Sequence, residues 1–448
     1  MNLFALVLLG GCNADFRGLR VRPLDAVGNV IEVTWRREED EVGWVEYGDG
    51  FALSAPELRG ADEHRVLLLG LPQLTEVTLR PVIQRGGERV PGPERSEESR
   101  TLPPDLPEFQ LSVYEPDEDA GGYVLASTVG NPRSVVILNR QGEIVWYHVP
   151  EEPLVAVDPE LNHHGPGLLL NLTTAERDLD IGVLRSVGMD GEITRDLRLP
   201  LAHHVFEQLG GDRYAYLAMD LSEGPEGQPV VGDALTLIDG LGNSEVLWSS
   251  WDTFTWDGVE EAQEDFYPQG YDFTHGNGLF YDAEAGTLLY STRNLSTLVE
   301  LDAQSGEVVR MIGEQGGTTF SPSDAAFSHQ HCPTRTADGT LLVFDNGEPS
   351  KPGHPVTSVV REYEEGEGSL TELDRLPLRQ NLSVAVLGCA ERIEGGHTLS
   401  DWGSAGELVE FDADGEIVWQ LSGRAGVVLG NTTWIPDLYA LEDTVPIP

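Results

Sequence analysis

Histidines recur in three separate stretches of this chain. The first stretch holds the pair His203-His204, the second holds His275 and the third holds His331. Imidazoles serve as nucleophiles, as proton donors and acceptors, and as ligands of zinc, copper or iron. The three stretches therefore predict a site for nucleophilic, acid–base or metal chemistry.

Two polar residues near the second stretch help to choose among these chemistries. Asn277 comes two residues after His275, and Arg293 follows that histidine by eighteen residues. A guanidinium beside a divalent cation is unfavourable, whereas Arg, His and Asn together supply a charged fork, protonable donors and amide N–H groups. We therefore expect a site for a tetrahedral oxyanion, a sulfate or phosphate ester, and neither a metal ion nor another cofactor.

Each of these residues also has a structural interpretation. His275 can hydrogen-bond the turn of a neighbouring unit, and Arg293 can form a salt bridge. The pair His163-His164 has no matching partner elsewhere, so we assign it a structural role. The combination of three histidine stretches argues against a bare scaffold.

A repeat indicates which elements position these residues. A glycine followed by an apolar strand occurs six times, at Gly122, Gly167, Gly211, Gly286, Gly339 and Gly396. A turn glycine followed by Glu-Ile-Val-Trp or a weaker version occurs at 142, 191, 242, 306, 368 and 415, with spacings of 47 to 64 residues. Six units of about this length, with no amphipathic helix, predict an all-β fold with a six-bladed β-propeller. An unrelated multi-sheet sandwich is the alternative.

In a propeller the innermost strands line a central channel, and the glycine of the first kind precedes the next strand outward. Residues seven to eleven positions before that glycine should therefore start the innermost strands and share one end of the channel. The histidine stretches of the third, fourth and fifth units occupy these positions. We expect the three imidazole groups to converge there.

The N-terminal part reads as a separate all-β domain. Short alternating strands over residues 13–104 predict a small β-sandwich, and the run Gly70-Leu-Pro-Gln-Leu-Thr75 resembles the corner of fibronectin type III-like domains. A Pro-, Glu- and Arg-rich linker follows between residues 86 and 107. The predicted ranges are a lipoprotein-type signal segment at 1–12, the sandwich at 13–104 and the propeller at 108–448.

Composition restricts the partners and the location of the chain. With 76 acidic and 28 basic residues, the formal net charge is −48, which disfavours nucleic acid and anionic lipid as partners. We interpret this charge as a solubility or salt adaptation, because the chain has no calcium-loop motif. The apolar start leads into Leu9-Gly-Gly-Cys12, which resembles a bacterial lipobox. We therefore expect an exported, periplasmic or cell-surface protein with a lipid on Cys12 as its membrane attachment.

The motifs resemble those of the aryl-sulfate sulfotransferases, a family that joins an N-terminal β-sandwich to a six-bladed propeller. The similar stretches are Asp272-Phe-Thr-His-Gly-Asn, Leu288-Leu-Tyr-Ser-Thr-Arg-Asn-Leu-Ser, Phe327-Ser-His-Gln-His, Leu341-Leu-Val-Phe-Asp-Asn-Gly and Leu387-Gly-Cys-Ala-Glu-Arg-Ile. They cover the propeller, chiefly residues 200 to 425. The resemblance implies that aryl sulfates and phenols are the small-molecule substrates.

By that resemblance His331 is the nucleophile that carries the sulfuryl group in a ping-pong reaction. His204 and His275 donate and accept protons, Arg293 and Asn277 hold the sulfuryl oxygens, and His203 contributes to substrate binding. No nucleotide sulfate donor is implied. The competing hypothesis is a surface lipoprotein whose propeller binds a ligand or a protein partner without catalysis, and a sulfatase is disfavoured because no Cys/Ser-x-Pro-x-Arg motif is present.

The two remaining cysteines depart from the family pattern. Cys332 stands directly after the nucleophile, where Asp or Thr is expected, and Cys389 stands where the family often has a polar residue. Both begin innermost strands of adjacent blades. Because an exported protein meets an oxidising compartment, a disulfide between them is a further hypothesis.

Overall fold

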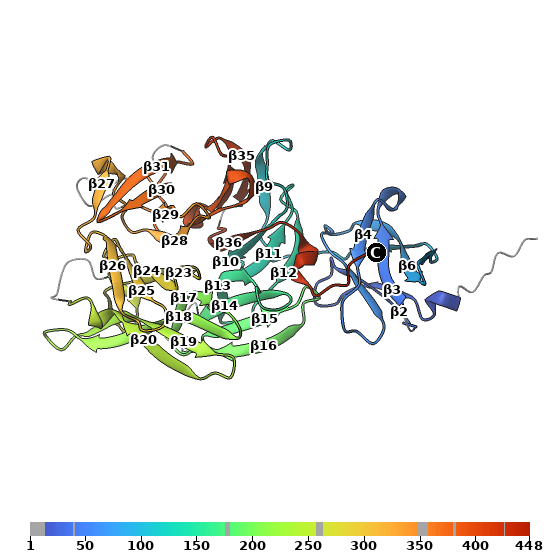
Figure 1. Cartoon of the computed structure of the whole chain (residues 1–448), viewed down its shortest axis with the longest axis horizontal. Helices are drawn as coiled ribbons and strands as arrows, with labels where there is room; N and C mark the ends of the chain where they lie inside the picture. Colours follow the sequence, from blue (N-terminus) through green and yellow to red (C-terminus); the bar gives the residue numbers. More distant parts are fainter. Residues whose placement is uncertain are drawn as a thin grey trace, which may run out of the picture. The chain divides into compact units, whose positions relative to one another are not determined.

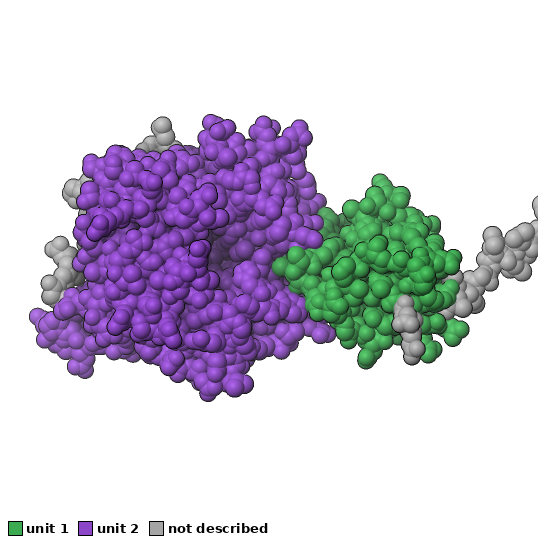
Figure 2. Space-filling model, in the orientation of Figure 1, with its two compact units in different colours: residues 1–102, 438–448 green, residues 103–437 purple. Residues whose placement is uncertain are grey.

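The computed structural model describes residues 14–38, 41–174, 180–256, 263–347, 357–379, 382–424 and 426–448. The chain forms two compact units, residues 1–102 with 438–448 and residues 103–437 (Figure 2). All described helices are 3₁₀ turns of three or four residues, so the fold is all-β. In the part of the chain that the structure describes, no helix has the length and apolarity needed to cross a bilayer.

The first unit contains two antiparallel sheets. One sheet has the order β1-β2-β5 and the other β4-β3-β6-β7, with β8 paired to β6. The strands are β1 (Arg20–Pro23), β2 (Ile31–Trp35), β3 (Glu41–Tyr47), β4 (Leu53–Pro56), β5 (His64–Leu68), β6 (Glu76–Arg85), β7 (Glu88–Pro91) and β8 (Arg95–Glu98). Residues from both sheets, among them Trp35 and Leu79, share one hydrophobic core.

The last residues of the chain belong to this first unit. The Tyr439 hydroxyl lies 3.4 Å from the Tyr47 hydroxyl and accepts a hydrogen bond from the Leu69 amide. These contacts return residues 438–448 to the N-terminal sheets, so the second unit ends at residue 437. The predicted propeller range of 108–448 differs from the structure at this end, because no strand period marks the return of the chain.

The second unit consists of six sheets within the described residues, antiparallel except where β22 pairs with β19 and β27 with β31 (Figure 1). Written from the innermost strand outward, they are β36-β10-β11-β12, β13-β14-β15-β16, β17-β18-β19-β20, β23-β24-β25-β26, β28-β29-β30-β31 and β32-β33-β34-β35-β9. The first three comprise β36 (Leu429–Ile435), β10 (Tyr123–Thr128), β11 (Ser134–Leu138), β12 (Ile144–His148), β13 (Leu154–Leu161), β14 (Leu168–Thr174), β15 (Val183–Val187), β16 (Ile193–Arg198), β17 (Ala202–Gln208), β18 (Arg213–Glu223), β19 (Pro229–Asp239) and β20 (Ser244–Ser249). The other three comprise β23 (Gly276–Asp282), β24 (Thr287–Thr292), β25 (Thr297–Asp302), β26 (Val308–Gly313), β28 (His331–Arg335), β29 (Leu341–Asp345), β30 (Val359–Gly366), β31 (Ser369–Leu376), β32 (Cys389–Arg392), β33 (Thr398–Asp401), β34 (Glu407–Phe411), β35 (Ile417–Gly423) and β9 (Phe109–Tyr114). The short strands β21 (Gln263–Tyr267), β22 (Gly270–Asp272) and β27 (Thr319–Ser321) extend the third and fifth sheets.

The innermost strands contact one another in a closed series. β36 contacts β13, and the series continues through β17, β23, β28 and β32 back to β36. Both ends of the unit close the series, because β9 pairs with β35 of the last sheet and β36 pairs with β10 of the first. This arrangement is propeller-like, and the space-filling view shows a hollow in this unit (Figure 2).

The glycines of the sequence repeat lie at the turns that begin these strands. β14 begins directly after Gly167, whose φ of 80° and close approach to the Val187 carbonyl leave no room for a side chain. Between neighbouring sheets, side chains from adjacent second and third strands form continuous cores, as where Leu289 and Leu298 pack with Leu341 and Val343. Rigid neighbouring sheets of this kind give the starts of the innermost strands fixed positions.

Candidate functional site

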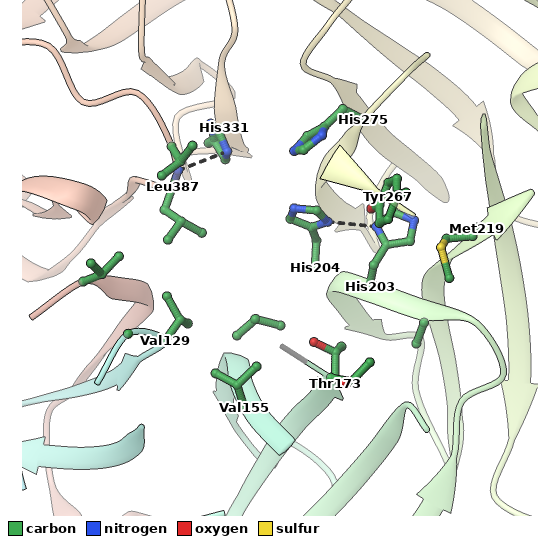
Figure 3. Close-up of a pocket in the computed structure, with 16 residues that line it drawn as sticks. Val129, Val155, Thr173, His203, His204, Met219, Tyr267, His275, His331 and Leu387 are labelled. Carbon is green, nitrogen blue, oxygen red and sulfur yellow. Dashed lines mark hydrogen bonds between the residues drawn. The ribbon is translucent and has the colours of Figure 1, made fainter. Parts of the chain in front are cut away.

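A cavity of ≈ 410 Å³ lies where the innermost strands begin (Figure 3). His203, His204, His275 and His331 all line it. The three histidine stretches that the sequence singled out thus meet at one cavity. In Figure 3 they face a space whose other side carries apolar side chains such as Val129 and Val155, so the cavity has a polar and an apolar side.

His331, the first residue of β28, is held by two hydrogen bonds. Its Nδ1 lies 2.6 Å from Asn346 Oδ1, and its Nε2 lies 3.3 Å from the Leu387 amide nitrogen. Asn346 Nδ2 donates to the carbonyl oxygens of Val384 and Leu387, both at 2.8 Å, which orients Oδ1 toward the imidazole. His331 therefore donates from Nδ1, and the lone pair of Nε2 accepts from the Leu387 N–H and faces the cavity.

The charge state of His331 follows from its surroundings. Burial lowers its pKa to about 3, and the positive charge of Arg293 adds to this effect. The side chain is therefore neutral at physiological pH, with an unprotonated Nε2 whose lone pair accepts the hydrogen bond from the Leu387 N–H. Neutral imidazole is the form that attacks an electrophile.

His275 directly precedes β23 and is backed by a carboxylate. Its Nδ1 is hydrogen-bonded to Asp272 Oδ2, at the end of β22. Both residues are buried. A buried carboxylate behind an imidazole selects its tautomer and stabilises the protonated ring, an arrangement suited to acid–base work.

The adjacent histidines of β17 both line the cavity but have different partners. His203 Nε2 lies 3.0 Å from Asp233 Oδ1, and the two Nδ1 atoms of His203 and His204 are 2.8 Å apart. The ring of His204 meets that of His275 edge-on, with centroids 5.0 Å apart. His204 is thus the member of the pair closer to the second imidazole, and His203 supports it from behind.

Asp233 of β19 connects the two histidine stretches. Besides contacting His203, it accepts hydrogen bonds from the Gly276 amide at 2.7 Å and the Tyr290 hydroxyl at 2.6 Å. Burial alone would raise the pKa of Asp233, but the hydrogen bond and charge of His203 lower it below its usual value. The carboxylate therefore stays ionised and anchors the start of β23 next to β17.

Arg293 and Asn277 occupy positions behind the cavity wall. Asn277 Nδ2 donates to the Gln330 carbonyl at 2.8 Å, directly before His331. Arg293 follows β24, its Nη2 donates to the Ala385 carbonyl at 3.3 Å, and its charge acts on the pKa of His331. Neither is among the residues that line the cavity. In this arrangement both side chains brace the surroundings of His331.

Unusual backbone conformations occur at the cavity, where His204, His275 and Leu387 are lining residues, and next to it at Cys332. Nine described non-glycine residues have positive φ, among them His204 at 52°, His275 at 49°, Cys332 at 47° and Leu387 at 64°. Such conformations are costly for residues with a Cβ, and they persist where the surrounding structure over-determines them. Backbone strain is therefore part of this site.

The structure joins Cys332 and Cys389 in a disulfide. Their Cα atoms are 5.0 Å apart, which is within the range of disulfides in general, and they are separated by 57 positions in sequence. The disulfide links the second residue of β28 to the first residue of β32. Cys12, the expected lipid-bearing cysteine, lies outside the described residues.

Several site groups were not identified from the sequence. Sequence patterns assigned no role to Asn346, although it lies within the Phe-Asp-Asn-Gly stretch. No sequence pattern identified Asp233, because its partners are 30 to 60 positions away along the chain. Tyr267 of β21 also lines the cavity, with its ring 5.9 Å from that of His203 and 6.5 Å from that of His275. The Leu387 N–H is a backbone group, which side-chain patterns cannot reveal.

The described residues contain no group of three or more His, Cys, Asp or Glu side chains arranged to hold a metal ion. His163 and His164 lie away from the histidine cavity and line a second cavity of ≈ 560 Å³. The second cavity contains three glutamates, Glu160, Glu207 and Glu391.

Comparison with known proteins gives one family match. Residues 217–424 match the profile of the Arylsulfotransferase (ASST) family. No curated protein matches the chain. The matched region contains His275, Arg293 and His331, while His203 and His204 lie before it.

Similar solved structures include a protein of unknown function from Bacteroides caccae, with 14% identity over 70% of this chain and 98% of that one, at a TM-score of 0.43. A virginiamycin B lyase from Staphylococcus aureus has 12% identity over 70% of this chain and 88% of its own, at a TM-score of 0.35. A streptogramin B lyase has 12% identity over 73% of this chain and 98% of its own, at a TM-score of 0.37. At these identities and TM-scores the likenesses say nothing about activity.

Proposed function

The chain belongs to the arylsulfotransferase family through residues 217–424, and we propose that it transfers a sulfuryl group from an aryl sulfate ester to a phenol by way of a sulfohistidine at His331. The observation that carries this proposal is the state of His331. Its Nδ1–H is fixed by Asn346, its pKa is lowered to about 3, and its Nε2 lone pair faces a cavity lined by three further imidazoles. This is the arrangement that a neutral imidazole nucleophile requires.

In the first half-reaction the Nε2 lone pair of His331 attacks sulfur and an N–S bond forms. The bond between sulfur and the aryl oxygen breaks, and the departing phenolate takes a proton from the imidazole of His204 or His275. Asp272 stabilises the protonated form of His275 before this transfer. General acid catalysis of this kind contributes about 10²- to 10⁴-fold.

In the second half-reaction the acceptor phenol occupies the place of the first product. The imidazole that lost its proton takes the phenolic proton, the phenol oxygen attacks sulfur, and the N–S bond breaks to return the lone pair to His331. The apolar side of the cavity, which includes Val129, Val155, Val157 and Val428, suits the aryl ring of either substrate. No nucleotide donor takes part in this sequence.

The positions of Arg293 and Asn277 favour indirect roles in the proposed reaction. Burial keeps His331 neutral, and the charge of Arg293 adds to this effect and attracts the sulfuryl group. Asn277 fixes the peptide before His331 through Gln330. His203 holds His204 in place through the contact between their Nδ1 atoms. Electrostatic groups that are fixed before the reaction lose no free energy to reorganisation when charge develops.

We propose, at a finer level, that the second unit is a six-bladed β-propeller and the first unit a β-sandwich. Six sheets whose innermost strands contact in a closed series support the propeller, and a core shared by two antiparallel sheets supports the sandwich. A crystal structure of the full chain tests both assignments.

We also propose export and lipidation of Cys12. The Cys332–Cys389 disulfide supports export, since disulfides persist in oxidising compartments. Labelling of the chain with a radioactive fatty acid in a bacterial host should mark the wild type and leave Cys12→Ala unlabelled. Equal labelling of both proteins would contradict lipidation at this residue.

Intact-mass spectrometry tests the function. After incubation with 4-nitrophenyl sulfate and no acceptor, the protein should gain one SO₃ group, mapped by peptide analysis to His331, and should lose it when a phenol is added. His331→Asn should show no gain. A folded wild-type protein that never gains the group would overturn the proposal and favour a propeller that binds ligands without catalysis.

A further inference from the structure

The segment of residues 384–389, which precedes and starts β32, surrounds the side chain of His331. Asn346, the partner of His331 Nδ1, donates to the carbonyl oxygens of Val384 and Leu387. Arg293 donates to a third carbonyl of the segment at 3.3 Å. The segment is thus fixed by Asn346, which sets the tautomer of His331, and by Arg293, whose charge adds to burial in keeping His331 neutral.

The Leu387 N–H of this segment is aimed at the nucleophilic atom. Its nitrogen lies 3.3 Å from His331 Nε2, as the dashed line in Figure 3 shows. When Nε2 forms a bond to sulfur its lone pair is consumed, so it can no longer accept this hydrogen bond. The acceptors closest to the Leu387 N–H are then the sulfuryl oxygens, which are bonded to the sulfur atom on Nε2. Their negative charge grows as the aryl oxygen leaves, and a donor already in place stabilises it.

The disulfide ties this amide to the nucleophile through a short covalent path. Cys332 follows His331 directly, and Cys389 comes two residues after Leu387. Two non-glycine residues on this path have positive φ, Cys332 at 47° and Leu387 at 64°. A strained backbone of this kind relaxes unless it is constrained from both ends, and the disulfide supplies the constraint.

We propose that the Leu387 N–H is a further donor to the transferring sulfuryl group and that the Cys332–Cys389 disulfide positions it. The inference rests on the proposed function, because it assigns a role within the same transfer. The Leu387 amide is the group that touches the reacting atoms. Cys332 and Cys389 are positioning residues that act through the backbone of the 384–389 segment.

Replacement of the Leu387 amide by an ester tests the donor directly. Incorporation of the α-hydroxy analogue of leucine at position 387 removes the N–H and keeps the side chain. We expect formation of the sulfohistidine to slow by about 10²- to 10³-fold, the usual cost of losing one such donor. The same replacement at Leu241, an exposed turn residue away from the cavity, is the control and should cost less than about 3-fold.

The double variant Cys332→Ser/Cys389→Ser tests the positioning role. We expect kcat for aryl-sulfate transfer to fall about 10- to 100-fold while KM changes less than about 3-fold, because the substrate still binds but the donor is misplaced. Chemical reduction of the wild type should reproduce this fall, and reoxidation should restore the rate. A purely structural disulfide would instead lower the amount of folded protein without this split between kcat and KM.

The outcomes separate the two proposals. A wild-type protein that forms no sulfohistidine overturns the proposed function. A wild type that forms it, with an ester variant at position 387 that forms it equally fast, overturns the inference alone. If the double serine variant fails to fold, the ester variant at position 387 still tests the donor role of the Leu387 N–H, because it retains the disulfide.

Discussion

Two cavities of the second unit lie at opposite ends of the same innermost strands. The histidine cavity is formed by the starts of β17 and β28, and the second, acidic cavity by residues near the ends of β13, β17 and β32, where Glu160, Glu207 and Glu391 are found. The acidic cavity is the larger of the two, at ≈ 560 Å³ against ≈ 410 Å³. Size therefore does not distinguish the site that can do chemistry.

The two cavities differ in how their titratable groups are partnered. Burial favours the neutral form in both, lowering the pKa of His331 to about 3 and raising that of Glu391 to about 7. Burial also raises the pKa values of Glu160 and Glu207 well above their usual range, and the charge of Asp158 raises them further. A neutral histidine exposes a lone pair, whereas a neutral carboxylic acid offers only a weak nucleophile. Burial in the histidine cavity thus produces a neutral imidazole that can act as a nucleophile. In the acidic cavity it favours protonated carboxyl groups, which are poor nucleophiles.

The largest expected effect comes from exchanging the nucleophile. His331→Asn should lower aryl-sulfate transfer by at least about 10³-fold, since the covalent step is lost. His163→Asn, in the acidic cavity, is the matched control and should keep the wild-type rate. Both are measured by release of nitrophenolate in the presence of phenol. Equal rates for wild type and His331→Asn would place the chemistry elsewhere.

A smaller loss is expected for the carboxylate behind His275. Asp272→Asn should lower kcat by about 10²-fold, because the ring loses the partner that orients it and stabilises its charge. Glu391→Gln removes a half-buried carboxylate from the acidic cavity and should change kcat less than about 2-fold. The comparison fails if the two variants lose similar activity.

Glu391 in the acidic cavity and His331 in the histidine cavity should make the stability of the protein depend on pH in opposite directions. The unfolded chain loses the Glu391 proton near pH 4.5 and the folded chain near 7, so the folded state binds more protons in this window and its stability falls as pH rises. Glu391→Gln should therefore gain unfolding free energy over the wild type between these pH values, by up to about 3 kcal/mol.

For His331 the sign is reversed. The unfolded chain binds the proton near pH 6.5 and the folded chain only near 3, so this residue's contribution to stability is lost as pH falls through that range. Urea unfolding at pH 5 and pH 8 measures both effects. A gain for Glu391→Gln that is the same at both pH values would contradict the raised pKa of this carboxyl.

The smallest expected effect concerns the protonation state of His331, which should not change with pH. Nitrogen NMR of labelled protein should show His331 with a protonated Nδ1 and an unprotonated Nε2 throughout pH 5 to 8. The hydrogen bond to Asn346 and the lowered pKa both require this state. Protonation of Nε2 near pH 6 would show that the imidazole is not held neutral.

The strand repeat was predictable because it depends on local chemistry. Turn glycines at positions such as 167 and 306 need positive φ, and apolar strands must follow them, so their order along the chain places each sheet. Counting back from these glycines located His204, His275 and His331 at one end of the innermost strands. The return of residues 438–448 to the first unit left no such pattern.

The sequence by itself determined that three imidazole stretches share one end of a repeated strand scaffold, because strand periodicity and glycine turns act over a few residues. Only the tertiary structure decided the state of those imidazoles. Asn346 lies 15 positions from His331, and the Leu387 amide lies 56 positions away. Asn346, which fixes the proton on Nδ1, directly follows the neighbouring strand β29 of the same sheet. The backbone N–H that faces the Nε2 lone pair comes from the segment before β32, so this contact joins two different sheets and exists only once they have packed together.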